Sequence, residues 1–128
     1  MGPTIVVLSD QSEEIAGLVR KLRSYGFLVD EAFTPAEALE KVKLVKPRLF
    51  IASGNFQDAD SPRLAETVYE AHAIPTFIIL NDAGDTTQNR MIKHPGIIGV
   101  FFTPFNVDKL FERIRKFFEM MNTPQELK

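Results

Sequence analysis

The most informative stretch of this sequence is Ile5-Val6-Val7-Leu8, which stops abruptly at Ser9-Asp10-Gln11-Ser12. A continuous apolar run rich in β-branched residues is typical of a strand that is buried on both faces of a parallel sheet. The polar run that follows predicts that this strand ends at the carboxyl edge of the sheet. Apolar residues then recur at helical spacing from Ile15 to Leu22, so the strand is followed by a helix.

The alternation of strand and helix continues along the chain. Helix starts are indicated by Ser12 or Asp10, and by the pairs Thr34-Pro35 and Ser61-Pro62, in which proline takes the first helical position. The predicted strands are 5–8, 27–29, 49–52, 77–80 and 97–102. The first predicted helix starts after Ser12 or Asp10 and stops at Gly26, and the second runs from about 35 to 45. The third opens at Ser61-Pro62 and includes Val68, a short one is expected around 89–93, and the last includes 107–121. Continuous apolar strands that alternate with helices predict a doubly wound α/β fold. We expect a five-stranded parallel sheet with helices on both faces.

Composition indicates one globular domain. The 128 residues include 45% hydrophobic and 25% charged residues, which excludes a disordered or coiled-coil chain. We expect the domain to span residues 1–121, with 122–128 as a flexible tail or the start of a linker.

Charge and cysteine content exclude several classes of function. Fifteen basic and 17 acidic residues give a net charge of −2, which does not favour nucleic acid or an anionic membrane surface as a partner. The absence of cysteine excludes disulfides, thiolate nucleophiles and cysteine-bound metals. No apolar run approaches the roughly 20 residues that span a bilayer. We therefore expect a cytoplasmic protein.

Three parts of the chain together resemble a known family. They are Ile5–Asp10, Pro47–Ser53, and the pairs Ile74-Pro75 and Thr103-Pro104. In this order and spacing, the chain from Ile5 to about Met121 resembles a response-regulator receiver domain, which has a CheY-like, flavodoxin-like fold. This resemblance implies the strand order 2-1-3-4-5. The resemblance implies a role in signal transduction, within a two-component system or a phosphorelay.

The resemblance breaks down at the residues that carry out the phosphoryl chemistry of that family. Ser53 stands where a receiver has its phospho-acceptor aspartate, and Ser9 replaces the first of two acids, of which only Asp10 remains. A serine hydroxyl is a far weaker nucleophile than a carboxylate unless a base activates it. The backbone carbonyl of Asn55 could join Asp10 in holding Mg²⁺, but two ligands are a thin set, so we expect weak binding at best and assign no metal site.

Three further positions depart from the family's pattern. The phosphoryl-sensing hydroxyl residue corresponds to Leu80, or to Asn81 after a shift of one residue, and the lysine corresponds to Thr103. The aromatic switch corresponds to Val100. We interpret the chain as a degenerate pseudo-receiver without catalytic residues, cofactor or enzymatic activity.

The expected function is therefore protein–protein interaction that does not depend on phosphorylation. The family resemblance implies an interaction face that includes Val100, Phe102 and Phe105, with protein partners or other domains of a longer chain. One alternative is a flavodoxin-like domain that binds a small ligand, although no glycine-rich loop follows the first strand. The other is a receiver that is phosphorylated by an unorthodox route, at Asp10 or Asp82, which would lack the usual metal cage.

Overall fold

The structure is a computed structural model that describes residues 3–53, 61–81 and 95–126, with the backbone alone at 61–62, 81, 103 and 122–126. Its strands are β1 (Thr4–Leu8), β2 (Leu28–Ala32), β3 (Leu49–Ser53), β4 (Thr76–Asn81) and β5 (Ile97–Thr103). Its helices are α1 (Glu13–Tyr25), α2 (Pro35–Val45), α3 (Ser61–His72) and α5 (Val107–Glu126). The short helix predicted at 89–93 falls outside the described residues.

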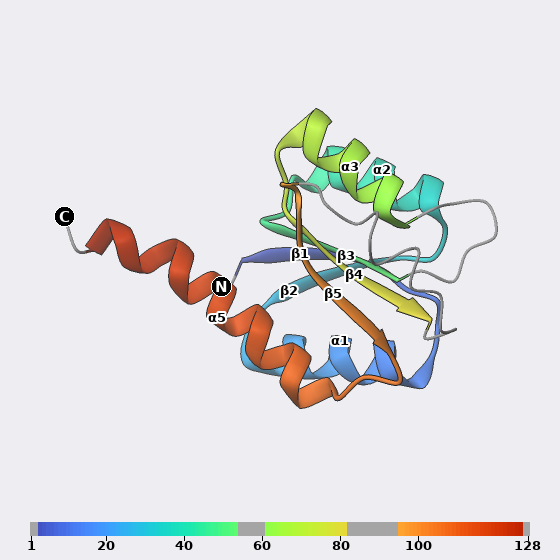
Figure 1. Ribbon diagram of the computed structural model, residues 1–128, viewed down its shortest axis with the longest axis horizontal. Coiled ribbons are helices and arrows are strands. Elements are labelled where there is room, and N and C mark those ends of the chain that lie inside the picture. The colour runs from blue at the N-terminus through green and yellow to red at the C-terminus, as the bar shows by residue number, and fades with distance from the viewer. Residues whose placement is uncertain (1–2, 54–60, 82–94, 127–128) are drawn as a thin grey trace.

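The five strands form one parallel sheet in the order β2-β1-β3-β4-β5 (Figure 1). This confirms the predicted doubly wound α/β fold and its strand order. Helices α2 and α3 cover one face of the sheet, and α1 and α5 cover the other (Figure 1). Because both faces are covered, the inner strands β1 and β3 are buried along almost their whole length.

The core consists of two layers separated by the sheet. Successive side chains of a strand point to opposite faces, so Val7 and Ile51 pack against α1 and α5. Their neighbours Leu8 and Phe50 pack against α2 and α3. The continuous apolar runs of the sequence are thus explained by burial on both sides.

The predicted helix starts agree with the structure. Ser12 is the N-cap of α1, since its Oγ accepts a hydrogen bond from the Ile15 N–H at 3.2 Å, which decides between the two predicted caps. Gly26 ends the helix with φ of 113°, a left-handed conformation that favours glycine. At α2, Thr34 Oγ1 accepts from the Glu37 N–H at 3.1 Å, and Pro35 takes the first position as predicted.

The structure corrects the bounds of two elements. The second strand runs from Leu28 to Ala32 instead of 27–29, because the Phe27 N–H donates to Leu22 O and closes the end of α1. Asp30 and Glu31 are tolerated in this strand because β2 is an edge strand.

The last helix continues to Glu126, beyond the predicted end at 121. The flexible tail or linker expected at 122–128 stays a prediction. The C-terminal part of α5 projects beyond the sheet (Figure 1). Although this is the longest helix, no helix in the described ranges combines the length and apolar character needed to span a membrane.

Candidate functional site

The carboxyl edge of the sheet brings together two small polar residues from neighbouring strands. Leu8 of β1 and Ala52 of β3 are Cα partners, and Ser9 and Ser53 directly follow them. Both serines are almost fully buried, with 2% of Ser9 and 1% of Ser53 exposed. The structure therefore places the predicted positions Ser9 and Ser53 side by side, with very little of either accessible to solvent.

The half-buried Asp10 takes part in the turn that leads into α1. Its Oδ1 accepts a hydrogen bond from the Ser12 N–H at 2.9 Å, and Ser9 Oγ accepts one from the Gln11 N–H at the same distance. Gln11 itself has φ of 65°, in the left-handed region. An aspartate that accepts from the backbone two residues on is a common turn former. The carboxylate thus supports this turn, while the cap of α1 that Asp10 was the other candidate for is Ser12.

The remaining predicted positions lie at the ends of β4 and β5, one of them in the core and two at the last pair of residues in the sheet. Leu80 is buried with Ala65 and Ile78 on the α3 side of the sheet, so this position belongs to the core. Asn81 and Thr103 are Cα partners at the last rung of the sheet. Asn81 is therefore the last residue of β4, and which of Leu80 and Asn81 corresponds to the sensing residue stays a prediction.

The described residues of this edge do not fit a magnesium site. Within residues 3–53, 61–81 and 95–126, no three His, Cys, Asp or Glu side chains lie close enough together to hold a metal. Mg²⁺ requires near-octahedral oxygen ligands, and one Oδ of Asp10 already accepts a backbone N–H. Asn55, the other predicted ligand, and Asp82, the alternative phospho-acceptor, lie outside the described residues.

The three residues of the predicted interaction face belong to two different clusters. Val100 and Phe102 are half-buried against Ala65, Ile78 and Leu80 on the α3 side of the sheet. Phe105 packs against the cluster on the α1–α5 side, and its N–H donates to Glu14 Oε2 at 3.3 Å. The structure does not gather them into one patch, and their part in partner binding stays a prediction.

Two hollows that the sequence did not indicate lie away from the carboxyl edge. The larger one, about 470 Å³, lies between α1 and β2 and is lined by Thr4, Arg23, Phe27, Leu28, Val29 and Asp30. The second, about 270 Å³, lies between α5 and the sheet and is lined by Phe77, Ile98, Arg113, Lys116, Phe117 and Met120. We call the second the α5–β5 pocket. In the sequence, this pocket is indicated only by the spacing of residues 113, 116, 117 and 120, which places them on one side of a helix.

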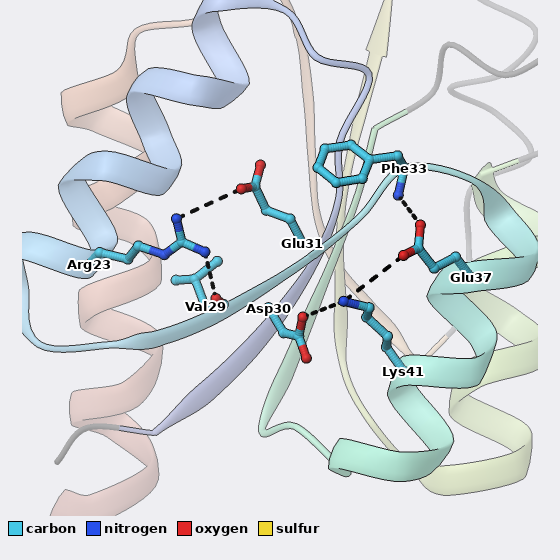
Figure 2. A network of polar contacts seen from close by, with 7 residues as sticks. All are labelled: Arg23, Val29, Asp30, Glu31, Phe33, Glu37 and Lys41. Atoms are coloured by element: carbon cyan, nitrogen blue, oxygen red, sulfur yellow. Dashed lines mark hydrogen bonds and ion pairs between the residues drawn. The ribbon is translucent and has the colours of Figure 1, made fainter.

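The charged groups beside the α1–β2 hollow are engaged with one another and with the outer edge of β2 (Figure 2). Arg23 Nη2 donates to the Val29 carbonyl at 2.9 Å, and its Nη1 lies 3.8 Å from Glu31 Oε1. On the α2 side, Lys41 Nζ donates to Asp30 Oδ1 at 2.6 Å, and this hydrogen bond raises the pKa of Lys41 above its ordinary value. Arg23 and Asp30, which line the hollow, are thus already engaged in polar contacts within the chain. These contacts lie along β2, an edge strand that could otherwise pair with another strand.

Comparison with solved structures shows which fold this is. A two-component response regulator from Clostridium difficile matches with a TM-score of 0.83 and 18% identity, over 94% of this chain and 98% of that chain. A CheY-like receiver domain protein from Methanospirillum hungatei matches with a TM-score of 0.80 and 16% identity, over 97% and 99%. The chain thus has the fold of response-regulator receiver domains.

A third structure contains the fold within a longer protein. It is described as one of a family of redox sensors in the streptococci that evolved from two-component response regulators, with a TM-score of 0.83 and 17% identity. The match covers 99% of this chain and 56% of that one. A scan against protein-family models and a search of curated proteins found no match.

Proposed function

We propose that this chain is a pseudo-receiver, a signal-transduction module that is not switched by aspartyl phosphorylation and that acts by binding other proteins. It has no enzymatic activity of its own in this proposal, and it works in the cytoplasm. Its partners are other proteins or other domains of a longer chain. The receiver fold supports the general role by analogy, and the residues of the carboxyl edge support the specific one.

The observation that carries the proposal is the pair of buried serines at this edge. In a receiver, the residue at the end of the third strand accepts the phosphoryl group, and here that residue is Ser53, which is 1% exposed. Ser9, directly after β1, supplies no carboxylate either. Phosphoryl transfer depends on groups that stabilise the developing charge, above all a metal ion and a cation. Between the end of β1 and the start of α1, Asp10 is the one carboxylate.

The streptococcal neighbour supports the idea that this fold can serve other signals. That protein is described as a redox sensor that evolved from response regulators. The present sequence contains no cysteine, so a thiol-based redox switch is not available to it. Constitutive or otherwise regulated protein binding is the function that fits both the fold and the altered edge.

An NMR titration of backbone amides tests the proposal. The ligands are Mg²⁺ and beryllofluoride, which mimics an acyl phosphate, and the signals to follow are those of Asp10, Ser53, Asn55, Asn81 and Thr103. We expect these amides to stay unchanged at millimolar concentrations of ligand. Joint, saturable shifts would contradict the proposal and would favour the unorthodox phosphorylation route.

A matched variant shows whether the assay can detect a site on this scaffold. Ser9→Asp combined with Ser53→Asp restores carboxylates at the two altered positions beside Asp10. Three carboxylates are a far better ligand set for Mg²⁺ than one. We therefore expect this double variant, provided that it folds, to respond to Mg²⁺ where the natural chain does not.

A further inference from the structure

The outer edge of β2 carries a row of backbone groups that point away from the sheet. β2 stands at the end of the strand order, beside β1. The Leu28 N–H donates to Pro3 O at 3.0 Å, so the backbone of Leu28 faces β1. At the other end of the strand, Ala32 O accepts from the Ser9 N–H at 2.8 Å and faces β1 as well. Because backbone groups alternate in direction along a strand, the outward row belongs to Val29, Glu31 and Phe33.

Two side chains from the flanking helices cover this row at its ends (Figure 2). Arg23 of α1 donates from Nη2 to Val29 O at 2.9 Å. Glu37 of α2 accepts at Oε1 from the Phe33 N–H, also at 2.9 Å. Among the described residues, no side chain is hydrogen-bonded to the outward N–H or carbonyl group of Glu31, which lies between them. The ends of the outward row are therefore closed, and its centre is open.

The two covered groups are those that would bond to each other if β2 met its own copy. In an antiparallel pair centred on Glu31, the Phe33 N–H of one chain donates to Val29 O of the other. The same bond forms a second time, because such a pair has two-fold symmetry. Arg23 supplies the donor and Glu37 the acceptor that this second strand would supply. Both side chains thus satisfy, within one chain, the bonds that a second copy would make.

The charge at the centre of the edge also opposes such a pair. Glu31 would lie opposite Glu31 of the second copy, and like charges directly opposite each other destabilise a strand pair. Within one chain, this carboxylate is compensated by Arg23, whose Nη1 lies 3.8 Å from Glu31 Oε1. An experiment that opens the edge must therefore also make position 31 neutral.

We infer that Arg23 and Glu37 keep the β2 edge closed, and that the surface they close fits the β2 strand of a second copy of this chain. An open edge strand is a ready template for pairing with another chain. A second copy always carries the same edge, and it presents the two backbone groups in the order that the pairing needs. The inference goes beyond the proposed function, since it concerns how copies of this chain are kept apart and not the binding of a different protein.

The test compares two triple variants that lose the same charges. The open variant combines Arg23→Ala and Glu37→Ala with Glu31→Gln. The control variant combines Arg20→Ala and Glu40→Ala with Glu31→Gln. Arg20 and Glu40 are exposed on the same two helices, and neither forms a hydrogen bond or an ion pair with β2 among the described residues. Only the contacts that close the edge differ between the two variants.

Sedimentation velocity measures the oligomeric state, and amide hydrogen exchange of the ¹⁵N-labelled chain locates the interface. We expect the natural chain and the control variant to be monomers at about 1 mM protein, and the open variant to dimerise below this concentration. In the dimer, exchange of the amide at position 31 should slow by about tenfold or more, because its N–H becomes hydrogen-bonded.

A further variant closes the edge again in a different way. It carries Glu31→Pro in place of Glu31→Gln in the open variant. Proline has no N–H to offer at this outward position and is tolerated in an edge strand, so this variant should be a monomer. If the open variant does not fold, Arg23→Ala with Glu31→Gln takes its place, because it keeps the Glu37 contact at the start of α2. Its control is Arg20→Ala with Glu31→Gln.

Four outcomes would overturn the inference. The open variant could stay monomeric at about 1 mM, or the open and control variants could associate equally. The open variant could also associate without slower exchange at position 31, or the proline variant could associate as strongly as the open one. Each of these results would show that Arg23 and Glu37 do not hold the β2 edge closed against a second copy.

Discussion

The ring of Phe77 on β4 occupies the space in which a side chain on Gly99 of β5 would lie. The two residues are Cα partners, and a Cβ atom built on Gly99 would be 2.4 Å from Cδ1 of the Phe77 ring. The register shifts just before this pair, because Thr76 is the partner of Ile97. Glycine is therefore required here by a close approach, and the Arg113 guanidinium of α5 lies 5.8 Å from the centre of the same Phe77 ring.

Gly99→Ala should destabilise the protein by about 1–3 kcal/mol, since the new methyl group overpacks the Phe77 ring. Urea unfolding measures this change. The sign of the change in the free energy of unfolding is informative, because replacing a glycine in a strand interior by alanine normally stabilises a protein by about 0.5–1 kcal/mol. Gly17→Ala on α1 is the control: its Cβ would meet Arg20 and Val107 only at 3.8 Å, so it should stabilise by up to about 1 kcal/mol. Equal, stabilising effects of both substitutions would contradict the close approach.

Thr76→Val should stabilise the protein by about 1 kcal/mol. Thr76 is 0% exposed, and its Oγ1 has no hydrogen-bond partner among the described residues, so its burial carries an unrecovered cost. Valine has almost the same shape without the hydroxyl group. Thermal and urea unfolding measure the difference, with the exposed Thr67→Val on α3 as the control, which should change little. A destabilised Thr76→Val would mean that the hydroxyl group is satisfied in solution.

The Lys41 ammonium group should titrate above its ordinary pKa of 10.5, chiefly because it donates a hydrogen bond to Asp30. A folded-state pKa above the unfolded value means that this interaction stabilises the fold fully below pH 10.5. The contribution is lost as the pH rises through the raised pKa. A ¹³C NMR titration of the Lys41 Cε measures the pKa, and Asp30→Asn should lower it. Glu40→Gln, which removes a carboxylate outside this network, should not, and equal effects of both would refute the assignment.

Magnesium should leave the melting temperature of the natural chain almost unchanged. A site with a dissociation constant near 1 mM would stabilise the fold by about 1.4 kcal/mol at about 10 mM Mg²⁺. For a chain of this size that is a rise of roughly 4–8 °C. The single carboxylate of Asp10, which already accepts the Ser12 N–H, does not supply such a site. A rise of that size with Mg²⁺, absent with the same ionic strength of NaCl, would show that a metal site exists.

The local features of this fold could be read from the sequence because their causes are local. The apolar runs at residues 5–8 and 49–52 predicted buried strands, and the structure buries these runs completely. Ser12 and Thr34 predicted helix starts, because an N-cap needs only a side-chain oxygen within reach of the next turn. The parallel pairing of the strands followed from the alternation of strands and helices, and the strand order from the resemblance to receiver domains.

The second strand shows where local patterns fail. Asp30 and Glu31 are not typical strand residues, yet they lie in β2. They are tolerated because β2 is an edge strand with a neighbouring strand on one side only. Lys41 and Arg23 from the flanking helices pair with their carboxylates. At the candidate site, the positions of Ser9 and Ser53 could be predicted because both directly follow predicted strands. Their near-complete burial, and the assignment of Leu80 to the core, required the structure.

Sequence alone thus predicted most of the described elements and the α/β class, since both depend on residue type and short-range periodicity. The three-dimensional structure was needed to show that the Phe77 ring fills the space beside Gly99. It was also needed to show that Arg115 pairs with both Glu112 and Glu119, while Arg113 and Lys116 form no ion pair among the described residues. Such relationships depend on strand register and on how a helix is rotated against the sheet. Both are fixed by the packing of residues far apart in the chain, which no short stretch of sequence encodes.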